Sequence, residues 1–258
     1  APFTTQGPMA VATDSNGDIY VTGYFAGTGD FDPDGGERRT SLDYQDSFLS
    51  KFTNWGDFVW VRTWGGEHVQ LALDMATDDF GNVLVVGFFD QPTDFDPDGG
   101  DIRIPEGSGD IFVVKYGWSG DYKWVRTIGG PDADIHASSG PVVTVDNSGN
   151  IYLAGVYDGT INVDPDGYAP RTSNGLTDSF LVKFDPTGDF IWARSWGGDM
   201  HDEADGIAFD GLEGIYVVGI FRGTTDLDPI GQDLHPSNGE IDSFISKFDT
   251  SGHFSWGH

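Results

Sequence analysis

Residues 30–36 read Asp-Phe-Asp-Pro-Asp-Gly-Gly, and closely related stretches begin at residues 94, 162 and 226. These starting positions lie 64, 68 and 64 residues apart. Other residues keep the same intervals, among them Gly23, Gly87, Gly155 and Gly219, and Trp60, Trp124, Trp192 and Trp256. Self-similarity at a fixed period of this size is the signature of a repeat architecture. Four repeats account for all of the sequence, so we expect a single repeat domain over residues 1–258.

Each repeat predicts four β-strands. In the first repeat, residues 9–13, 19–25, 47–52 and 58–64 are rich in β-branched, aromatic and small residues. Turns with Asp, Asn and Gly separate them. Gly23 lies inside the second segment, where a strand glycine usually marks a bulge or a close backbone approach. A sustained helical period is missing from the sequence, which argues against helical repeats.

Four antiparallel strands per repeat are typical of a β-propeller blade. We therefore predict an all-β, β-propeller-type repeat protein with four blades of four antiparallel strands. The predicted blades are approximately residues 1–64, 65–132, 133–196 and 197–258. A blade needs a neighbour to bury its faces, and we expect the recurring tryptophans to pack between blades.

The order of motifs within a repeat resembles a known family. Ile-Tyr-Val-x-Gly is followed by Gly-Thr-x-Asp-Phe-Asp-Pro, Asp-Ser-Phe-x-x-Lys-Phe, Gly-Asp-Phe-x-Trp and Trp-Gly-Gly. Over its whole length the chain is similar to the bacterial β-propeller repeat of the seven-bladed type, the SBBP repeat. The resemblance implies an exported or cell-surface bacterial protein and says little about activity. Four repeats instead of seven leave open a closed four-bladed ring, blades completed by a second copy, or part of a longer array.

The Asp-rich stretch lies in a connection of about 20 residues between the second and third strands, which we expect to have no regular structure. Oxygen-bearing side chains at alternate positions, followed by Gly, are suited to wrapping a hard cation. Another acid recurs at the start of the third strand. We predict about one Ca²⁺ per repeat, with weakest binding in the fourth, where Ile230 replaces the third acid. The predicted ligands are Asp30, Asp32, Asp34 and Asp46; Asp94, Asp96, Asp98 and Asp110; Asn162, Asp164, Asp166 and Asp178; and Asp226, Asp228 and Asp242.

The same stretch has a second interpretation as turn chemistry. Asp bonds to nearby backbone amides, Pro fixes φ, and Gly accepts positive φ. Recurrence in four copies favours calcium over turn chemistry alone. The loop differs from an EF-hand, because Ser41 stands where the bidentate Glu would be needed. Magnesium is less favoured, since it keeps its waters and seldom uses all-protein cages.

Composition excludes several classes of protein. The formal charge of −29 argues against a nucleic-acid partner. The sequence has no Cys, which rules out disulfides and thiolate metal sites. It also has no apolar run of the roughly 18 residues needed for a membrane span. Calcium is plentiful outside cells, which favours a secreted or cell-surface location.

Two further sets of charged residues recur. We expect structural ion pairs or blunted strand edges from the basic set Lys51, Lys115, Lys183 and Lys247 with Arg62, Arg126 and Arg194. Acids and histidines follow each Gly-Gly, including Asp132, Asp134, His136, His201, Asp202 and Glu203. For this second set we expect a solvated acidic rim in preference to a second metal site.

Regularity guides the functional prediction, because a unique catalytic cluster is not evident in the sequence. We predict a non-enzymatic, calcium-binding structural or adhesive module of a bacterial surface or filamentous assembly. Self-association by ring completion or head-to-tail polymerisation is the expected partnership. The alternative is a lectin-like, carbohydrate-binding propeller, which requires exposed Trp55 or Trp118 for sugar stacking. Less favoured is a polysaccharide-active enzyme with a site near His136 or His201.

Overall fold

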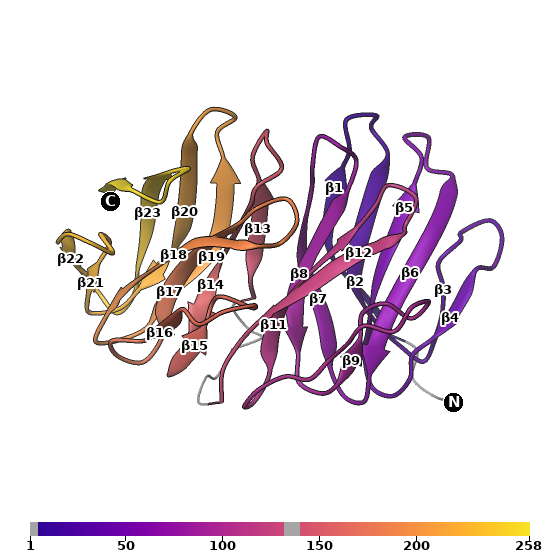
Figure 1. Ribbon diagram of the computed structural model, residues 1–258, viewed down its shortest axis with the longest axis horizontal. Helices are drawn as coiled ribbons and strands as arrows, with labels where there is room; N and C mark the ends of the chain where they lie inside the picture. The colour runs from indigo at the N-terminus through magenta and orange to yellow at the C-terminus, as the bar shows by residue number, and fades with distance from the viewer. Residues whose placement is uncertain (1–4, 132–139) are drawn as a thin grey trace. The chain divides into compact units, whose positions relative to one another are not determined.

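The structure is a computed structural model that describes residues 5–131 and 140–258 (Figure 1). Every regular element in these residues is a β-strand, which confirms the predicted all-β class. No helix in the described part of the chain is long and apolar enough to cross a membrane. Two compact units are present, residues 1–127 and residues 128–258. The predicted boundary at residues 132–133, together with Asp132, Asp134 and His136, lies outside the described residues.

The first unit contains two repeats. Its strands are β1 (Thr5–Thr13), β2 (Ile19–Ala26), β3 (Thr28–Asp30), β4 (Arg38–Thr40), β5 (Asp46–Phe52), β6 (Phe58–Gly66), β7 (Gln70–Thr77), β8 (Val83–Phe89), β9 (Thr93–Asp94), β10 (Ile102–Arg103), β11 (Asp110–Tyr116) and β12 (Tyr122–Ile128). One antiparallel sheet has the order β1-β2-β5-β6-β9-β10, and a second has the order β12-β11-β8-β7. Strands β3 and β4 form a separate hairpin. The first sheet of this unit therefore ends with two strands that belong to the second repeat.

The second unit repeats the same plan. Its strands are β13 (Val142–Val145), β14 (Ile151–Tyr157), β15 (Thr160–Asn162), β16 (Pro170–Thr172), β17 (Asp178–Phe184), β18 (Phe190–Gly198), β19 (Asp202–Phe209), β20 (Gly214–Phe221), β21 (Thr224–Asp226), β22 (Leu234–Pro236), β23 (Asp242–Asp249) and β24 (Phe254–Gly257). The sheets have the orders β13-β14-β17-β18-β21-β22 and β19-β20-β23-β24, with β15-β16 as a hairpin. Again the first sheet of the unit borrows a hairpin from the following repeat.

The long connection between the second and third strands differs from the sequence prediction. It was expected to lack regular structure, but each copy contains a short antiparallel hairpin, such as β3–β4 in the first repeat. The hairpin forms because the Asp-rich turn brings its two arms together. The copies β9–β10 and β21–β22 also hydrogen-bond to the last strand of the preceding repeat. In these two copies, the Asp-rich connection therefore adds strands to the sheet of the preceding repeat.

The glycine inside three of the four second strands lies opposite a bulge, as the sequence predicts. Gly87 pairs with Ala72 where the register of β7 shifts, and Gly23 and Gly219 face equivalent shifts. A Cβ atom at Gly87 would lie 1.8 Å from the carbonyl oxygen of Leu71. The bulged strand therefore approaches too closely for any side chain.

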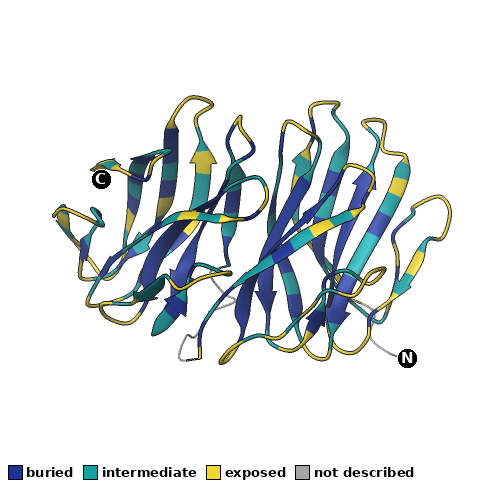
Figure 2. Cartoon of the chain, viewed as in Figure 1, coloured by how far each residue is buried: buried dark blue, intermediate teal, exposed yellow. Residues whose placement is uncertain are grey.

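The cores are built by aromatic residues of the third and fourth strands. In the first unit Trp64 on β6 packs against Tyr116 on β11, with ring centroids 5.6 Å apart. In the second unit Trp196 on β18 packs against Phe248 on β23 at 5.2 Å. Figure 2 shows the buried strands in dark blue and the exposed turns in yellow. A tryptophan at the end of one repeat thus fills the core of the next.

Candidate functional site

The Asp-rich stretches form the turns of the short hairpins, and their first hydrogen bonds are those of turn chemistry. In the first repeat, the amide of Asp32 donates to Asp30 Oδ1 at 3.3 Å, and the amide of Asp34 donates to Asp32 Oδ1 at 3.0 Å. The first of these bonds recurs in the other repeats at 3.1, 3.3 and 3.2 Å, from the amides of Asp96, Asp164 and Asp228. Successive side chains therefore cap the backbone two residues ahead.

The apolar residue inside each stretch anchors the loop. Phe31 is buried between Phe25 and Phe48, with ring centroids at 5.2 and 5.0 Å. Phe95 packs on Phe112 at 4.9 Å. The counterparts in the third and fourth repeats, Val163 and Leu227, are fully buried. This anchor was missed from the sequence, although the apolar character of that position in all four copies was a signal for it.

The fit of the loops to a calcium ion is incomplete. The turn bonds use one oxygen each of Asp30 and Asp32, and the other oxygen of Asp30 lies 3.7 Å from Arg38 Nε. Among the described residues, however, no three Asp, Glu or His side chains lie where they could hold one metal ion. The carboxylates do not converge on a common point, so these loops are not a preformed calcium shell.

The acid at the start of each third strand contacts a different turn. Its carboxylate accepts a hydrogen bond from the amide four residues earlier: Leu42 to Asp46, Glu106 to Asp110, Asn174 to Asp178, and Asn238 to Asp242, at 3.1, 3.2, 3.1 and 2.7 Å. The first three of these acids are buried. Their contacts are therefore those of a turn cap, and the role of closing metal ligand stays a prediction.

Burial changes the proton affinity of these carboxyl groups. It raises the pKa of Asp46 to about 6, of Asp110 to about 7 and of Asp178 to about 6. The cause is loss of hydration, which disfavours the charged form. Among the described residues, Asp46 Oδ1 and Asp178 Oδ1 have no hydrogen-bond partner. The three groups hold a proton at pH values where an exposed Asp has lost it.

The Gly-Gly pair after β6 and β18 makes room for two close approaches. A Cβ atom on the first glycine, Gly65 or Gly197, would collide with the carboxyl group of Asp46 or Asp178. A Cβ atom on the second, Gly66 or Gly198, would collide with a backbone carbonyl of the next repeat. Since Gly65 pairs with Asp94 and Gly197 with Asp226, the pair fixes each Asp-rich hairpin to the preceding sheet.

The expected solvated acidic rim is wrong for one of its members. Asp202 is fully buried, and its Oδ2 accepts a hydrogen bond from the Gly198 amide at 2.8 Å. Gln70 makes the matching contact in the first unit, accepting from the Gly66 amide at 3.1 Å. Burial raises the pKa of Asp202, and the charge of Asp202 is one of the causes that raise the pKa of Asp178. The position of Asp202 in the fold therefore decides whether its side chain is solvated, and its charge does not.

Consecutive repeats are joined by a set of contacts that we call the turn clasp. It consists of the recurring Lys, Trp and Arg of one repeat and the turn between the third and fourth strands of the next. Lys51 Nζ and Trp60 Nε1 both donate to the carbonyl oxygen of Trp118 at 3.3 Å. Arg62 Nε donates to the carbonyl oxygen of Gly120 at 2.6 Å. The three side chains thus hold backbone atoms of their neighbour.

The clasp occurs again in the second unit with nearly the same geometry. Lys183 Nζ and Trp192 Nε1 donate to the carbonyl oxygen of Thr250 at 2.9 and 3.3 Å. Arg194 Nε donates to the carbonyl oxygen of Gly252 at 2.8 Å. The recurring basic residues were predicted to form structural ion pairs, and Lys51 does so, 3.0 Å from Asp18 and 3.6 Å from Asp14. Their second partner, a turn 67 residues away, was not predicted.

We expect Lys51→Met to lower the free energy of unfolding by about 3 kcal/mol, because it leaves the buried Asp14 carboxylate without its cation and removes a clasp contact. Urea denaturation at neutral pH measures the change. The matched control is Lys123→Met. Its side chain is 45% exposed and pairs with Asp121 at the surface, so a change within about 0.5 kcal/mol is expected. Equal losses in the free energy of unfolding would show that Lys51 stabilises the fold no more than the exposed Lys123 does.

Comparison with known proteins gives two similarities. No family model matches the chain, so its resemblance to the SBBP repeat stays a prediction. It is 25% identical, over 96% of its length, to the uncharacterized WD repeat-containing protein L264 of Acanthamoeba polyphaga mimivirus. It is 32% identical, over 57% of its length, to the regulatory protein FlaEY of Caulobacter vibrioides.

These relatives are much longer proteins. The chain spans 22% of the length of the first and 15% of the length of the second. WD repeats form propeller blades of four-stranded sheets, so the first similarity agrees with the repeated, all-β architecture of the two units.

Proposed function

We propose that the chain is a non-catalytic structural module of propeller type, whose repeats are four blades, and that it serves in an exported assembly. The observation that carries this proposal is the turn clasp, which uses the same three side-chain types on the same two carbonyl groups in both units. A contact made largely to backbone atoms tolerates changes in the turn sequence, and it suits serial addition of blades.

The test of this function is electron microscopy of the purified chain at millimolar calcium. We expect rings completed by a second copy or linear polymers, because stacked blades present unequal ends and a heterologous contact extends into larger assemblies. Single, unassociated chains at all concentrations would contradict the proposal. Assemblies that form equally well in chelator would show that assembly does not require calcium.

Calcium binding is a separable part of the proposal. It is supported by four Asp-rich loops at regular spacing and by a net charge of −29 that cations would relieve. Three carboxylates in the first two loops and two in the others are the candidate ligands, and further oxygens would come from loop carbonyls and water. Side-chain movement is needed to bring them to one ion.

We expect millimolar Ca²⁺ to raise the melting temperature by several degrees relative to excess chelator, because an ion that binds only the folded state stabilises it. Mg²⁺ at the same concentration is the control and should have a smaller effect. The substitution pair Asp96→Asn and Asp98→Asn in the second repeat should reduce the shift, whereas Asp79→Asn, in the turn between β7 and β8, should preserve it. The same melting temperature in Ca²⁺, in Mg²⁺ and in chelator would mean that the Asp-rich stretches act only as turns.

Carbohydrate binding is the second candidate function. The observation that favours it is the exposure of Trp55 and Trp118, which are 87% and 65% exposed. Exposed indole rings stack on the apolar faces of sugars. Glycan-array binding that is lost in both Trp55→Ala and Trp118→Ala would support this function. The enzymatic alternative has less in its favour: the described residue His201 contacts the Thr177 hydroxyl at 3.1 Å through Nδ1.

A further inference from the structure

Buried oxygen atoms without hydrogen-bond partners gather at the junction between the third and fourth repeats. Among the described residues they are Asp178 Oδ1, Asp202 Oδ1, and the hydroxyl oxygens of Thr225 and Tyr157. All four side chains belong to residues that are buried, and all lie within the second compact unit. Buried polar atoms cost free energy unless a partner satisfies them. The junction therefore has the chemistry of a site that takes a ligand.

The backbone places the two carboxylates next to each other. An isolated β-bridge joins Thr177 to His201, and the Asp202 amide donates to the Thr177 carbonyl at 2.9 Å. Asp202 is therefore bonded to the residue that immediately precedes Asp178. Burial is the main cause that raises the pKa of Asp178, and the nearby charge of Asp202 raises it further. Two like charges are thus held together in the interior.

The Gly197–Gly198 pair lies between these side chains and Thr225. A Cβ atom on Gly197 would lie 2.4 Å from Asp178 Oδ1, and the Gly198 amide donates to Asp202 Oδ2 at 2.8 Å. Thr225 pairs with Gly198 across β18 and β21. Burial raises the pKa of Asp202, and the Thr225 hydroxyl is near enough to offset part of that rise. Oxygens from three side chains therefore converge beside one dipeptide.

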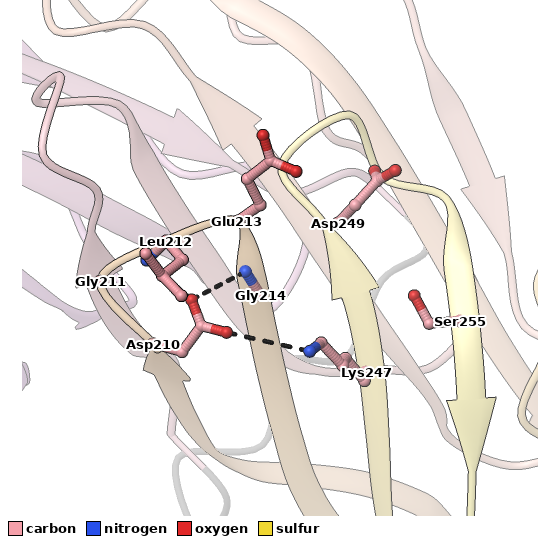
Figure 3. Close-up of a pocket in the computed structure, with 8 residues that line it drawn as sticks. All are labelled: Asp210, Gly211, Leu212, Glu213, Gly214, Lys247, Asp249 and Ser255. Carbon is pink, nitrogen blue, oxygen red and sulfur yellow. Dashed lines mark hydrogen bonds and ion pairs between the residues drawn. The ribbon is translucent and has the colours of Figure 1, made fainter.

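Another acid of the same unit shows how a purely structural carboxylate is held. In the pocket around Lys247, Asp210 accepts a hydrogen bond from the Gly214 amide at 3.0 Å and lies 3.8 Å from Lys247 Nζ (Figure 3). An amide and a cation thus satisfy it together. Asp178 and Asp202 each have an amide donor, but no Lys, Arg or His of the described chain forms an ion pair with either. Their charge has no counterpart in the protein.

The matching junction of the first unit has one acid fewer. Gln70 stands where Asp202 stands in the repeat. Its Oε1 accepts from the Gly66 amide and its Nε2 donates to the Glu67 carbonyl, both at 3.1 Å. Asp46 is the remaining buried carboxylate there. The amide of Gln70 satisfies both of its polar ends, whereas an ionised carboxylate in the same place has no donor to offer.

The hydroxyl groups of the two junctions differ in the same direction. Thr93, the counterpart of Thr225, donates its hydroxyl to the Gln91 carbonyl at 2.9 Å. Tyr157 pairs directly with Asp178 across β14 and β17. The other repeats have Phe at this position, at residues 25, 89 and 221. Compared with the first unit, the second therefore gains a carboxylate and a phenol and leaves one hydroxyl without a partner.

We infer that the second unit binds a calcium ion at this junction, held by Asp178, Asp202 and Thr225. Each carboxylate keeps one oxygen on a backbone amide and gives the other to the ion. The side-chain donors are all oxygen, which suits a hard cation, and two buried negative charges call for a divalent one. Ca²⁺ is favoured over Mg²⁺, which gives up its waters reluctantly. Backbone carbonyls and water complete the shell.

This site is separate from the Asp-rich turns, and the inference rests neither on those turns nor on the proposed assembly. Asp178 was predicted to close the third Asp-rich loop, and it would serve the junction instead. The site has two carboxylates, in agreement with the finding that no three acidic or His side chains of the described residues group around one ion. Asp199 and Met200, shortly before Asp202, are exposed, so an ion has a short path from solvent.

Calorimetric titration of Ca²⁺ into the full chain, after dialysis against chelator, counts the bound ions. Asp202→Gln is the deciding variant, because it installs the residue that the first unit accommodates at this position. We expect it to lose one equivalent of bound Ca²⁺, or to bind that ion at least about a hundredfold more weakly. The matched control is Asp199→Asn, an exposed acid three residues earlier, which should bind as many ions as the unmodified chain.

The melting temperature gives a second readout. Asp202→Gln, checked by circular dichroism in chelator for a native fold, should gain less from Ca²⁺ than the unmodified chain does. A third-loop variant, Asp164→Asn with Asp166→Asn, should keep the junction ion. Loss of an equivalent in the loop variant but not in Asp202→Gln would overturn the inference and leave calcium binding by the Asp-rich turns standing. Full binding by both variants would also overturn it, and would assign the buried oxygens to water.

Discussion

The free energy of unfolding is expected to fall as the pH is raised from about 4 to about 8. Burial gives Asp46, Asp110 and Asp178 folded-state pKa values of about 6, 7 and 6, against an ordinary value of 3.8. Between these values the folded chain holds protons that the unfolded chain has released, so stability decreases with rising pH. A difference of about three in pKa corresponds to on the order of 4 kcal/mol for Asp110 alone. Urea denaturation at several pH values measures the slope.

The variant Asp110→Asn identifies the source of this slope. It keeps the shape of the buried side chain and removes its titration, so the fall in stability above pH 6 should become shallower. General repulsion from the net charge of −29 has the same sign and would survive the substitution. An unchanged slope in the variant would assign the pH dependence to net charge. Below about pH 4 the trend should reverse, since hydrogen bonds from Asn150 and Ser148 outweigh burial and lower the pKa of Asp146.

Gly198→Ala is the single substitution expected to do most damage to the join between repeats. A Cβ atom at this position would lie 1.9 Å from the carbonyl oxygen of Thr224, and neither backbone can move without breaking the pairing of β18 with β21. We expect a loss of about 3 kcal/mol or more in the free energy of unfolding. Urea denaturation followed by tryptophan fluorescence reports the change, because Trp196 lies two residues away in the core.

Gly239→Ala is the control in the same unit. A Cβ atom at Gly239 meets no atom within 4 Å among the described residues, and its backbone is outside the left-handed region. A change within about 0.5 kcal/mol is expected. Comparable losses from the two substitutions would mean that glycine is needed for flexibility throughout, and not for close approach at residue 198.

Much of the fold follows from the sequence because the same short-range signals occur four times. Alternating apolar residues, Asp-Asn-Gly turns and a strand glycine predict the positions of the long strands, and the bulge opposite Gly87 confirms the interpretation of that glycine. The turn chemistry of the Asp-rich loops can also be predicted from residue types. The Asp32 carboxylate, for example, accepts a hydrogen bond from the Asp34 amide.

Other features depend on contacts between repeats, which a single repeat does not encode. The Trp118 carbonyl that Lys51 binds is 67 residues away. Asp202 is buried and bonds to the Gly198 amide, at the end of β18 that pairs with β21 of the next repeat. The Gly-Gly pair admits a carboxyl group on one side and a backbone carbonyl of the next repeat on the other, and both of these groups come from outside the pair's own strand. The calcium prediction gains no support from side-chain convergence and awaits measurement.

The central claim is that one contact, the turn clasp, joins consecutive repeats within the chain. The most direct measurement is urea denaturation of the unmodified chain and of Trp60→Ala, which removes the indole donor to the Trp118 carbonyl. The account predicts that the variant loses about 2 kcal/mol or more of the free energy of unfolding. Equal free energies of unfolding for the two proteins would contradict it.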